Sequence, residues 1–363
     1  MQTAIPYMHL RGGSSKGLYF NAKDLPADEA TRNKVILAAI EGSDAGDARQ
    51  IDGLGGGSSL SSKVAIVSPS DTEGVDLDYF FIQVMIGKGR VSATQTCGNI
   101  LAGVLPFAIE SGMIQATHPT TRAKINIVNT GGICEVVVET PNFHVNYAGN
   151  TKIDGVLGTA APIVCNYLGT EGSTCGALLP TGNAIDIIDG KQMTCIDNGM
   201  PLVILKATDF EISGYETKEE LDNNTALKTT LEAIRLQIGH KMNLGNVENQ
   251  SIPKMCLISP SLNNGLINTR MFIPHVCHDA IGVLAAVSVA TACLLPNTIT
   301  KNIASTPENI HRGLSVEHPS GEFTVNLEVS FNENKELKIE KSGVIRTARL
   351  LSKGVVFIPN FLV

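Results

Sequence analysis

The feature that most constrains the fold is a cysteine that precedes an apolar stretch and occurs twice, half a chain apart. Cys97 opens the segment CGNILAGVLPFAIESGMI, and Cys277 opens the segment CHDAIGVLAAVSVATACLL. The two cysteines are 180 positions apart in a chain of 363 residues. Apolar residues surround the axis of each predicted helix on all sides, so each helix must be enclosed by other elements. The repeat therefore predicts two similar units with one buried helix each.

The residues around each apolar stretch predict short strands. Runs rich in valine and isoleucine, such as 64–67 and 134–139, are separated by glycine and Pro-Asn turns. We therefore expect an α/β fold of two pseudo-symmetric lobes, each a curved sheet wrapped around a central helix. The pattern restarts near 180–183, so we place the lobes at 1–184 and 185–363, with a last strand that can return to the first lobe. Two lobes also suit the length, because single cores stop growing at roughly 250–300 residues.

Charge and composition limit the classes of partner that this chain is expected to bind. The net charge is -7 and no Lys/Arg cluster occurs, so we expect no nucleic-acid partner. The longest apolar run, 280–295, is interrupted by Ser288 and Thr291 and is shorter than the roughly 20 residues of a membrane span, so we expect no membrane partner. The eight cysteines form no CxxC pair. Reduced thiols in a cytoplasm fit this pattern, and the start of the chain has no secretory signal pattern.

Two side chains are candidates for moving protons. Cys97 stands at the start of a predicted helix, where free N–H groups and the positive end of the helix dipole favour a thiolate. The alternative is an inert buried cysteine. Lys63 follows the small and flexible residues of 52–62 and begins a strand, so beside a cleft it could carry a proton. The alternative for Lys63 is a solvated strand end.

Several other residues are candidates for binding an anion. The glycine-rich loop 11–17 contains Ser14 and Ser15 and can present backbone N–H groups to an anion, or it is a plain hairpin turn. If the lobes face each other, both helix starts point into one cleft, which would suit a small polyanion. The remaining candidates for that cleft are Gly98 and Asn99 beside Cys97, Arg270, His278, and Ser320 in the polar turn 317–321.

Common cofactor motifs are absent from the sequence. The segment 275–278 contains metal-ligating residue types, but it lacks the paired spacing of a zinc site, so we expect no metal. No GxGxxG follows a predicted strand, which argues against a dinucleotide cofactor. No GxSxG elbow supports a serine hydrolase.

Taken together, the motifs resemble those of the PrpF family, within the diaminopimelate epimerase fold superfamily. They run nearly end to end in the family's order: RGGSSKG, DGLGGGSSLSSKVAIV, CGNILAGVLPFAIESG, LPTGN, CIDNGMP, NTRMFIPHVCH, EHPSGEF and VIRTARLL. The resemblance implies a site between the lobes, no metal and no organic cofactor. It also implies that a lysine and a cysteine carry protons, and these roles fall on Lys63 and Cys97. Ser15 and His278 match residues that line the cleft.

Two positions depart from related patterns. Ser14 stands where the family usually has threonine, which keeps the hydroxyl. His278 follows Cys277 where the epimerases of this fold have glycine, so a symmetric two-cysteine mechanism is not expected.

The resemblance implies a cofactor-independent isomerase that shifts a proton across an allylic unit of a small unsaturated tricarboxylate. We expect it to act as a homo-oligomer. Three alternatives stay open: the same chemistry on 2-methylaconitate or methylitaconate, an amino-acid racemase or epimerase, and a non-catalytic accessory protein that binds carboxylates.

Overall fold

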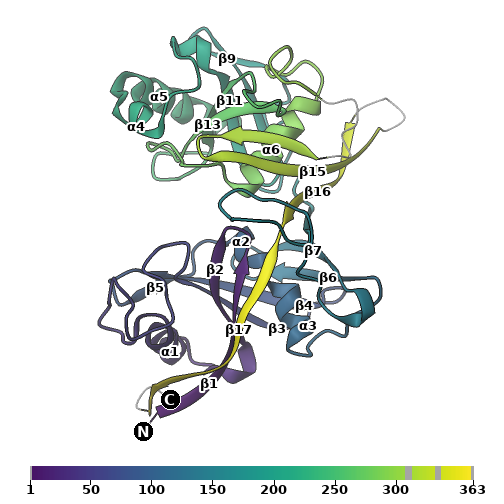
Figure 1. Cartoon of the computed structure of the whole chain (residues 1–363). Helices are drawn as coiled ribbons and strands as arrows, with labels where there is room; N and C mark the ends of the chain where they lie inside the picture. The colour runs from purple at the N-terminus through teal and green to yellow at the C-terminus, as the bar shows by residue number, and fades with distance from the viewer. Residues whose placement is uncertain (1, 307–312, 332–336, 361–363) are drawn as a thin grey trace. The chain divides into compact units, whose positions relative to one another are not determined.

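The computed structural model describes residues 2–306, 313–331 and 337–360. Contacts divide the chain into two compact units (Figure 1). Unit 1 comprises Met1–Leu168 and Ile345–Val363, and unit 2 comprises Gly169–Val344. None of the helices in these described ranges is long and apolar enough to cross a membrane.

Unit 1 is a mixed sheet with three α-helices among its described residues. Its strands are β1 (Gln2–Gly12), β2 (Ser15–Asn21), β3 (Lys63–Pro69), β4 (Leu77–Met85), β5 (Arg90–Ser92), β6 (Thr120–Ile127), β7 (Gly132–Glu139), β8 (Ile163–Leu168) and β17 (Ala348–Pro359). Its helices are α1 (Glu29–Glu41), α2 (Gly98–Leu101) and α3 (Val104–Glu110), with short 3₁₀ turns at Ala22–Asp24 and Pro141–Phe143. Strand β17 pairs antiparallel with β1, so the end of the chain belongs to unit 1.

Unit 2 has the same kinds of element. Its strands are β9 (Asp186–Ile188), β10 (Lys191–Asp197), β11 (Pro201–Lys206), β12 (Lys254–Ser259), β13 (Ile267–Phe272), β14 (Leu314–His318), β15 (Gly321–Phe331) and β16 (Leu337–Arg346), whose last two residues are counted in unit 1. Its helices are α4 (Lys218–Asn223), α5 (Thr225–Lys241) and α6 (Val283–Leu294), with a 3₁₀ turn at Ala207–Phe210.

The two units repeat one order of strand pairing. In unit 1, β1 and β2 are antiparallel, β2 and β3 parallel, β3 and β4 antiparallel, β4 and β6 parallel, and β6 and β7 antiparallel. In unit 2, the series from β10 through β11, β12, β13 and β14 to β15 has the same order. A parallel pair needs a crossover connection. Helices α1 and α5 lie in the first crossover of each unit, and α2–α3 and α6 lie in the second. The predicted α/β fold of two similar lobes is confirmed.

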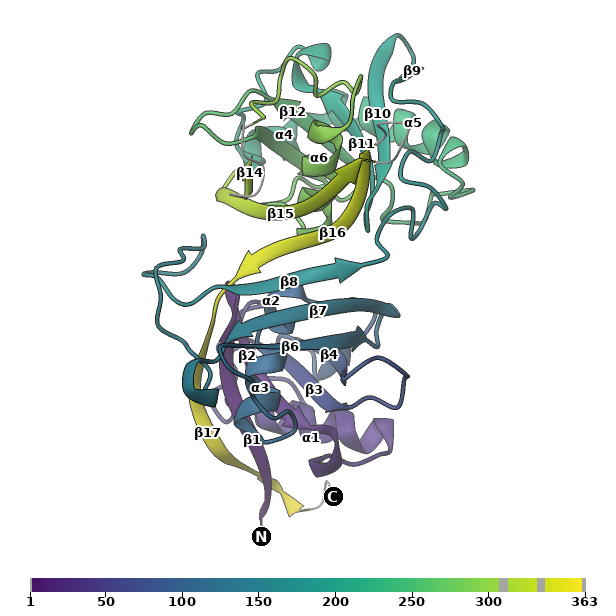
Figure 2. The same ribbon diagram turned by 90° about the vertical axis from the view of Figure 1, so that its right-hand side faces the viewer.

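The apolar helices are enclosed by strands, as a helix without a polar face requires. In unit 1, α2 contacts β1, β2 and β3, and α3 contacts β3 and β7. In unit 2, α6 contacts β10, β11, β14 and β15 (Figure 2). Helix α6 buries its small and branched residues almost completely, from Ala285 to Ala292.

The predicted helix after Cys97 is divided in the structure. The stretch after Cys97 forms α2 and α3 instead of one helix, because the Ile100 carbonyl accepts bonds from the Tyr19 hydroxyl at 2.6 Å and from the Gly103 N–H at 3.0 Å. The latter is a tighter, 3₁₀-type bond. In unit 2, α4 and α5 are separated at Asn224, whose side chain accepts from the Leu227 N–H at 3.0 Å and caps α5.

The expectation that Cys277 opens the second apolar helix is wrong. Helix α6 begins at Val283, and Cys277 instead forms an isolated bridge with Phe272. The Cys277 N–H donates to the Asp222 carboxylate at 2.7 Å, and the Ala280 N–H donates to the His278 ring at 2.8 Å. These bonds to side chains hold the preceding segment in a non-helical conformation.

Candidate active site

Lys63 begins β3 and is buried, with only 8% of its surface exposed. Its amine donates a hydrogen bond to Gln83 Oε1 at 2.6 Å and lies 5.2 Å from the centre of the Phe81 ring. Lys63 and Gln83 are direct partners in the antiparallel pairing of β3 and β4. Strand register therefore places a polar acceptor next to this amine.

The orientation of the Gln83 amide is fixed by the backbone. Its Nε2 group donates to the carbonyls of Ser59, Ser62 and Val84, at 3.3, 3.0 and 3.2 Å. Carbonyls only accept, so the amide nitrogen must face them and Oε1 must face Lys63. No carboxylate in the described part of the chain forms an ion pair with Lys63. A neutral acceptor therefore holds the amine.

Cys97 is the N-cap residue of α2, at the helix start that the sequence predicts. Its side chain is half-buried and makes no capping bond. Its carbonyl accepts from the Leu101 N–H at 3.0 Å and from the Tyr79 hydroxyl at 3.1 Å. The backbone of Cys97 is thus held in place while its thiol takes no part in capping the helix.

The hairpin between β1 and β2 packs against the residue that follows Cys97-Gly98. A Cβ atom on Gly13 would lie 2.0 Å from the Asn99 side-chain oxygen, and one on Gly12 would lie 2.4 Å from the Asn99 carbonyl. Only glycine permits so close an approach. The Asn99 amide also donates to the Ser14 hydroxyl at 3.2 Å. The glycine-rich loop is therefore a hairpin whose tip contacts the start of α2.

The same hairpin also contacts Lys63. Gly17 of β2 pairs with Lys63, and a Cβ atom on Gly17 would lie 2.4 Å from the Lys63 carbonyl. Between these contacts, the Ser15 hydroxyl is buried and has no hydrogen-bond partner within the described ranges. A buried hydroxyl of this kind is available to a ligand. One hairpin therefore packs against both segments that carry the candidate proton carriers.

In unit 2, Arg270 of β13 is buried and its orientation is set by three bonds. Its Nε donates to the Glu216 carbonyl at 2.7 Å, and its Nη1 donates to the Asn268 side chain at 3.0 Å and to the Thr269 carbonyl at 2.9 Å. Burial lowers the pKa of Arg270 from its ordinary value, which still leaves a cation at neutral pH. The side chain is thus a fixed positive group.

Ser320 is hydrogen-bonded to the backbone of Asp279, the residue that follows His278 in the chain. The Ser320 hydroxyl donates to the Asp279 carbonyl at 2.7 Å. Burial, assisted by the charge of Lys254, lowers the pKa of His278, so its ring is neutral at neutral pH. Since Nδ1 accepts from the Ala280 N–H, the ring proton of the neutral form lies on Nε2. His278 can therefore donate a hydrogen bond without carrying a charge.

The structure groups the predicted residues by unit. Unit 1 holds Lys63, Cys97, Ser14, Ser15, Gly98 and Asn99, and unit 2 holds Arg270, His278 and Ser320. Gln83 was not among the predicted residues, although a glutamine within the apolar strand LDYFFIQVM is a visible signal. No group of three or more His, Cys, Asp or Glu side chains in the described residues could hold a metal ion.

Two equivalent α/β units that each enclose a helix define a fold found in amino-acid epimerases. The crystal structure of a hydroxyproline epimerase from Agrobacterium vitis matches 99% of this chain and 93% of its own, with a TM-score of 0.52 at 11% identity. The chain belongs to the PrpF protein family, whose model matches residues 2–359. The resemblance to this family inferred from the motifs is confirmed.

Relatives of nearly full length are isomerases. A 4-oxalomesaconate tautomerase from Pseudomonas putida KT2440 is 52% identical over 357 residues, which cover 98% of this chain and 97% of that protein. A (4E)-oxalomesaconate Delta-isomerase from Novosphingobium sp. KA1 is 50% identical over 355 residues, 98% of each chain. The crystal structure of a methylitaconate-delta-isomerase has a TM-score of 0.88 at 32% identity, and the match covers 100% of this chain and 97% of the other. The chain is accordingly an isomerase.

Proposed function

We propose that this isomerase catalyses a 1,3-allylic proton shift in 4-oxalomesaconate. Two relatives about half identical over nearly the whole chain, both named for oxalomesaconate, support this substrate. The observation that carries the mechanism is the Lys63 amine held by Gln83, on a strand that packs against the same hairpin as the Cys97 segment. Neither a metal nor an organic cofactor takes part in this proposal.

The reaction requires one proton to leave and another to arrive at a different carbon. A base removes a proton from a carbon next to the double bond, and the carbanion is delocalised as a dienolate over the keto group and the alkene. An acid then delivers a proton to the far end of the allylic unit. We assign Lys63 as the base and the Cys97 thiol as the acid, and the reverse order is the alternative. General acid–base transfer of this kind typically contributes about 10²–10⁴-fold to the rate.

Gln83 acts in this proposal as a positioning residue for Lys63. Its carbonyl oxygen accepts one N–H bond of the amine at 2.6 Å, and its own orientation is set by three backbone carbonyls. The remaining positions on the Lys63 nitrogen are then directed toward the substrate. Fixed geometry of this sort lowers the entropic cost of reaching the reactive arrangement.

The carboxylates need hydrogen-bond donors and positive charge. In unit 1 we propose the backbone N–H groups of Gly98 and of the 11–17 hairpin, with Ser14, Ser15 and Asn99. In unit 2 we propose Arg270 as the cation, with His278 and Ser320 as neutral donors. Loss of one donor that stabilises developing enolate charge typically costs about 2.7–4 kcal/mol.

The test follows deuterium by NMR in D₂O with 4-oxalomesaconate, 2-methylaconitate and methylitaconate as separate substrates. We expect deuterium at the allylic carbon of 4-oxalomesaconate with the highest kcat/KM. Faster turnover of either other acid would reassign the substrate. Exchange at the α-carbon of an amino acid would indicate a racemase or epimerase, and binding without exchange would indicate an accessory protein.

We further propose a role in the cytoplasmic breakdown of gallate and related aromatic acids, as a homo-oligomer. All eight cysteines are free thiols, which supports a reducing compartment. Deletion of the gene should block growth on gallate while growth on succinate continues, and normal growth on gallate would contradict this role.

A further inference from the structure

Three cationic side chains form one row across three neighbouring strands of unit 1. Arg11 of β1 is directly opposite Arg349 of β17 on one side and Lys16 of β2 on the other. Directly opposed residues of antiparallel strands share a face, with Cβ atoms about 4.5–5.5 Å apart, and like charges in such pairs are destabilising. Within the described residues, no carboxylate forms an ion pair with any of the three. The row therefore lacks a counter-charge from the protein.

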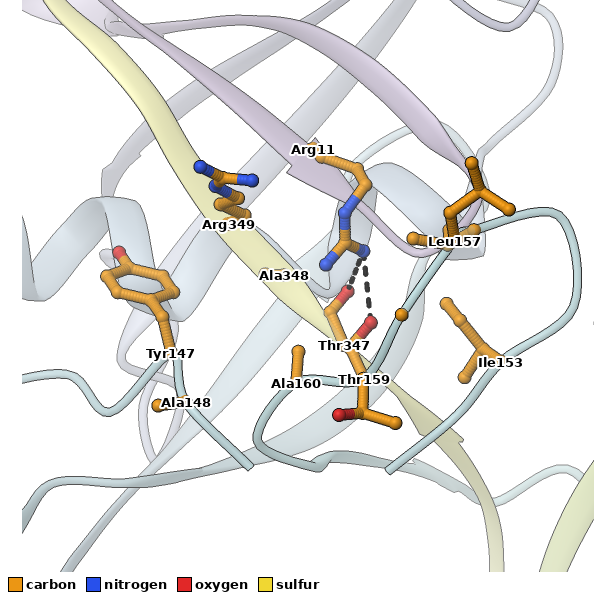
Figure 3. A pocket seen from close by; sticks show the side chains of 12 residues that line it. Arg11, Tyr147, Ala148, Ile153, Leu157, Thr159, Ala160, Thr347, Ala348 and Arg349 are labelled. Carbon is orange, nitrogen blue, oxygen red and sulfur yellow. Dashed lines mark hydrogen bonds between the residues drawn. The ribbon is translucent and has the colours of Figure 1, made fainter. Parts of the chain in front are cut away.

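A cavity of about 310 Å³ lies beside two members of this row. Figure 3 shows Arg11 and Arg349 on neighbouring strands, with Tyr147 to one side and the apolar side chains of Ile153 and Leu157 to the other. The cavity thus combines two positive groups with apolar walls, which is the usual composition of a site for a small organic ion.

Several N–H donors of the two guanidinium groups form no hydrogen bond with the described residues of the protein. Arg11 uses Nη1 alone, which donates to the Gly13 carbonyl at 2.7 Å and to the carbonyl and hydroxyl oxygens of Thr347 at 3.0 Å each. Its Nε and Nη2 groups, and all the donors of the exposed Arg349, have no protein partner in the part of the chain that the structure describes. A guanidinium carries five N–H donors in a planar fork that matches a carboxylate.

We propose that this cavity, which neither Lys63 nor Cys97 lines, is a second anion site and that it binds a small organic polycarboxylate. Arg11 and Arg349 each hold one carboxylate, and the apolar walls contact the carbon skeleton. The bound charge supplies the counter-ion that the row lacks. Because Arg11 also bonds Gly13, the site shares a side chain with the hairpin that contacts Asn99. The proposal does not depend on the substrate assigned above.

Calorimetric titration with tricarballylate tests the site, since this saturated tricarboxylate has no double bond to isomerise. The full chain, its Arg349→Gln variant and a Lys353→Gln control are titrated at constant ionic strength. Lys353 lies on the same strand and is exposed, but it does not line the cavity. We expect two binding events per chain in the wild type and in Lys353→Gln. In Arg349→Gln, one event should weaken at least tenfold.

Competition separates the two events. The inhibition constant of tricarballylate against the substrate should be the same in all three proteins, because Arg349 is outside the proposed catalytic groups. Equal stoichiometry and affinity in the wild type and in Arg349→Gln would overturn the proposal. Inorganic phosphate that binds to the cavity as tightly as tricarballylate would also overturn the assignment to an organic polycarboxylate.

Discussion

The two units place a lysine at the same point of the same topology, but in different surroundings. Lys63 begins β3 and Lys254 begins β12, and each strand is the second member of the first parallel pair in its unit. The Lys63 amine is held by Gln83 at 2.6 Å. Lys254 is instead close enough to His278 for its charge to lower the pKa of that ring. The duplicated fold therefore does not carry duplicated chemistry.

The corresponding cysteines of the two units also lie in different surroundings. Cys97 is half-buried at the start of α2, whereas Cys277 is almost fully buried and is not part of a helix. Burial, with a contribution from the Asp222 carboxylate, raises the pKa of Cys277 to about 11. Cys277 is therefore a thiol at neutral pH, and a mechanism with one reactive cysteine from each unit is not favoured. Under our proposal unit 1 moves protons, and unit 2 contributes to binding.

Replacing each of the two lysines should show the largest difference in activity between the two units. Lys63→Met keeps the length of the side chain but removes the amine, so we expect kcat/KM to fall about 10²–10⁴-fold. The matched variant Lys254→Met should stay within about tenfold of the wild type. Thermal melting checks that both fold. Full activity in Lys63→Met would remove this residue from the mechanism.

Replacing each of the two cysteines should also affect the units differently, with a smaller loss of kcat/KM than for the lysines. We expect Cys97→Ser to lower kcat/KM about 10²-fold, because a hydroxyl is a much weaker acid than a thiol. Cys277→Ser should remain within a few-fold of the wild type. Limited alkylation with iodoacetamide at pH 8, read by mass spectrometry, should modify Cys97 before Cys277, because only a thiolate reacts. Faster modification of Cys277 would reverse the comparison.

Gln83 is a further difference between the surroundings of the two lysines. In the described structure the Lys63 amine donates a hydrogen bond to the Gln83 side chain, and the Lys254 amine has no such hydrogen bond. Gln83→Leu removes the acceptor and should lower kcat about tenfold with little change in KM. An unchanged kcat in Gln83→Leu would mean that Gln83 does not position Lys63.

The smallest effect concerns stability at low pH. In unit 1, burial and the charge of Lys16 lower the pKa of His9 from 6.5 to about 4. The unfolded chain therefore binds a proton more readily between these values, and stability that is present above pH 6.5 is lost as the pH falls toward 4. Between pH 6.5 and pH 4, the Tm of His9→Gln should therefore decrease by roughly 2–4 °C less than the Tm of the wild type. An identical slope in the wild type and in His9→Gln would contradict the burial argument.

The fold could be predicted because its main signals are local. Two all-apolar helices and the alternation of short strands and turns are visible in the sequence, and they specify two similar lobes. The break between α2 and α3 and the start of α6 at Val283 could not be predicted, because they depend on distant side chains. Asp222 binds the Cys277 backbone, and Tyr19 binds the Ile100 carbonyl.

The candidate site could be predicted only in part. Motifs proposed Lys63 and Cys97 as candidates, but the link between Lys63 and Gln83 depends on the register of β3 and β4, which the sequence does not specify. The pair of Arg11 and Arg349 joins strands from opposite ends of the chain. No local pattern brings such residues together.

The most direct measurement is deuterium exchange in 4-oxalomesaconate in D₂O, followed at each carbon for Lys63→Met and Cys97→Ser. If Lys63 is the base and Cys97 the acid, Cys97→Ser still exchanges the first proton but forms almost no isomer. Lys63→Met should then lose both exchange and isomerisation. Exchange of the first proton in Lys63→Met and its loss in Cys97→Ser would reverse the two roles, and wild-type isomerisation in both variants would contradict the account.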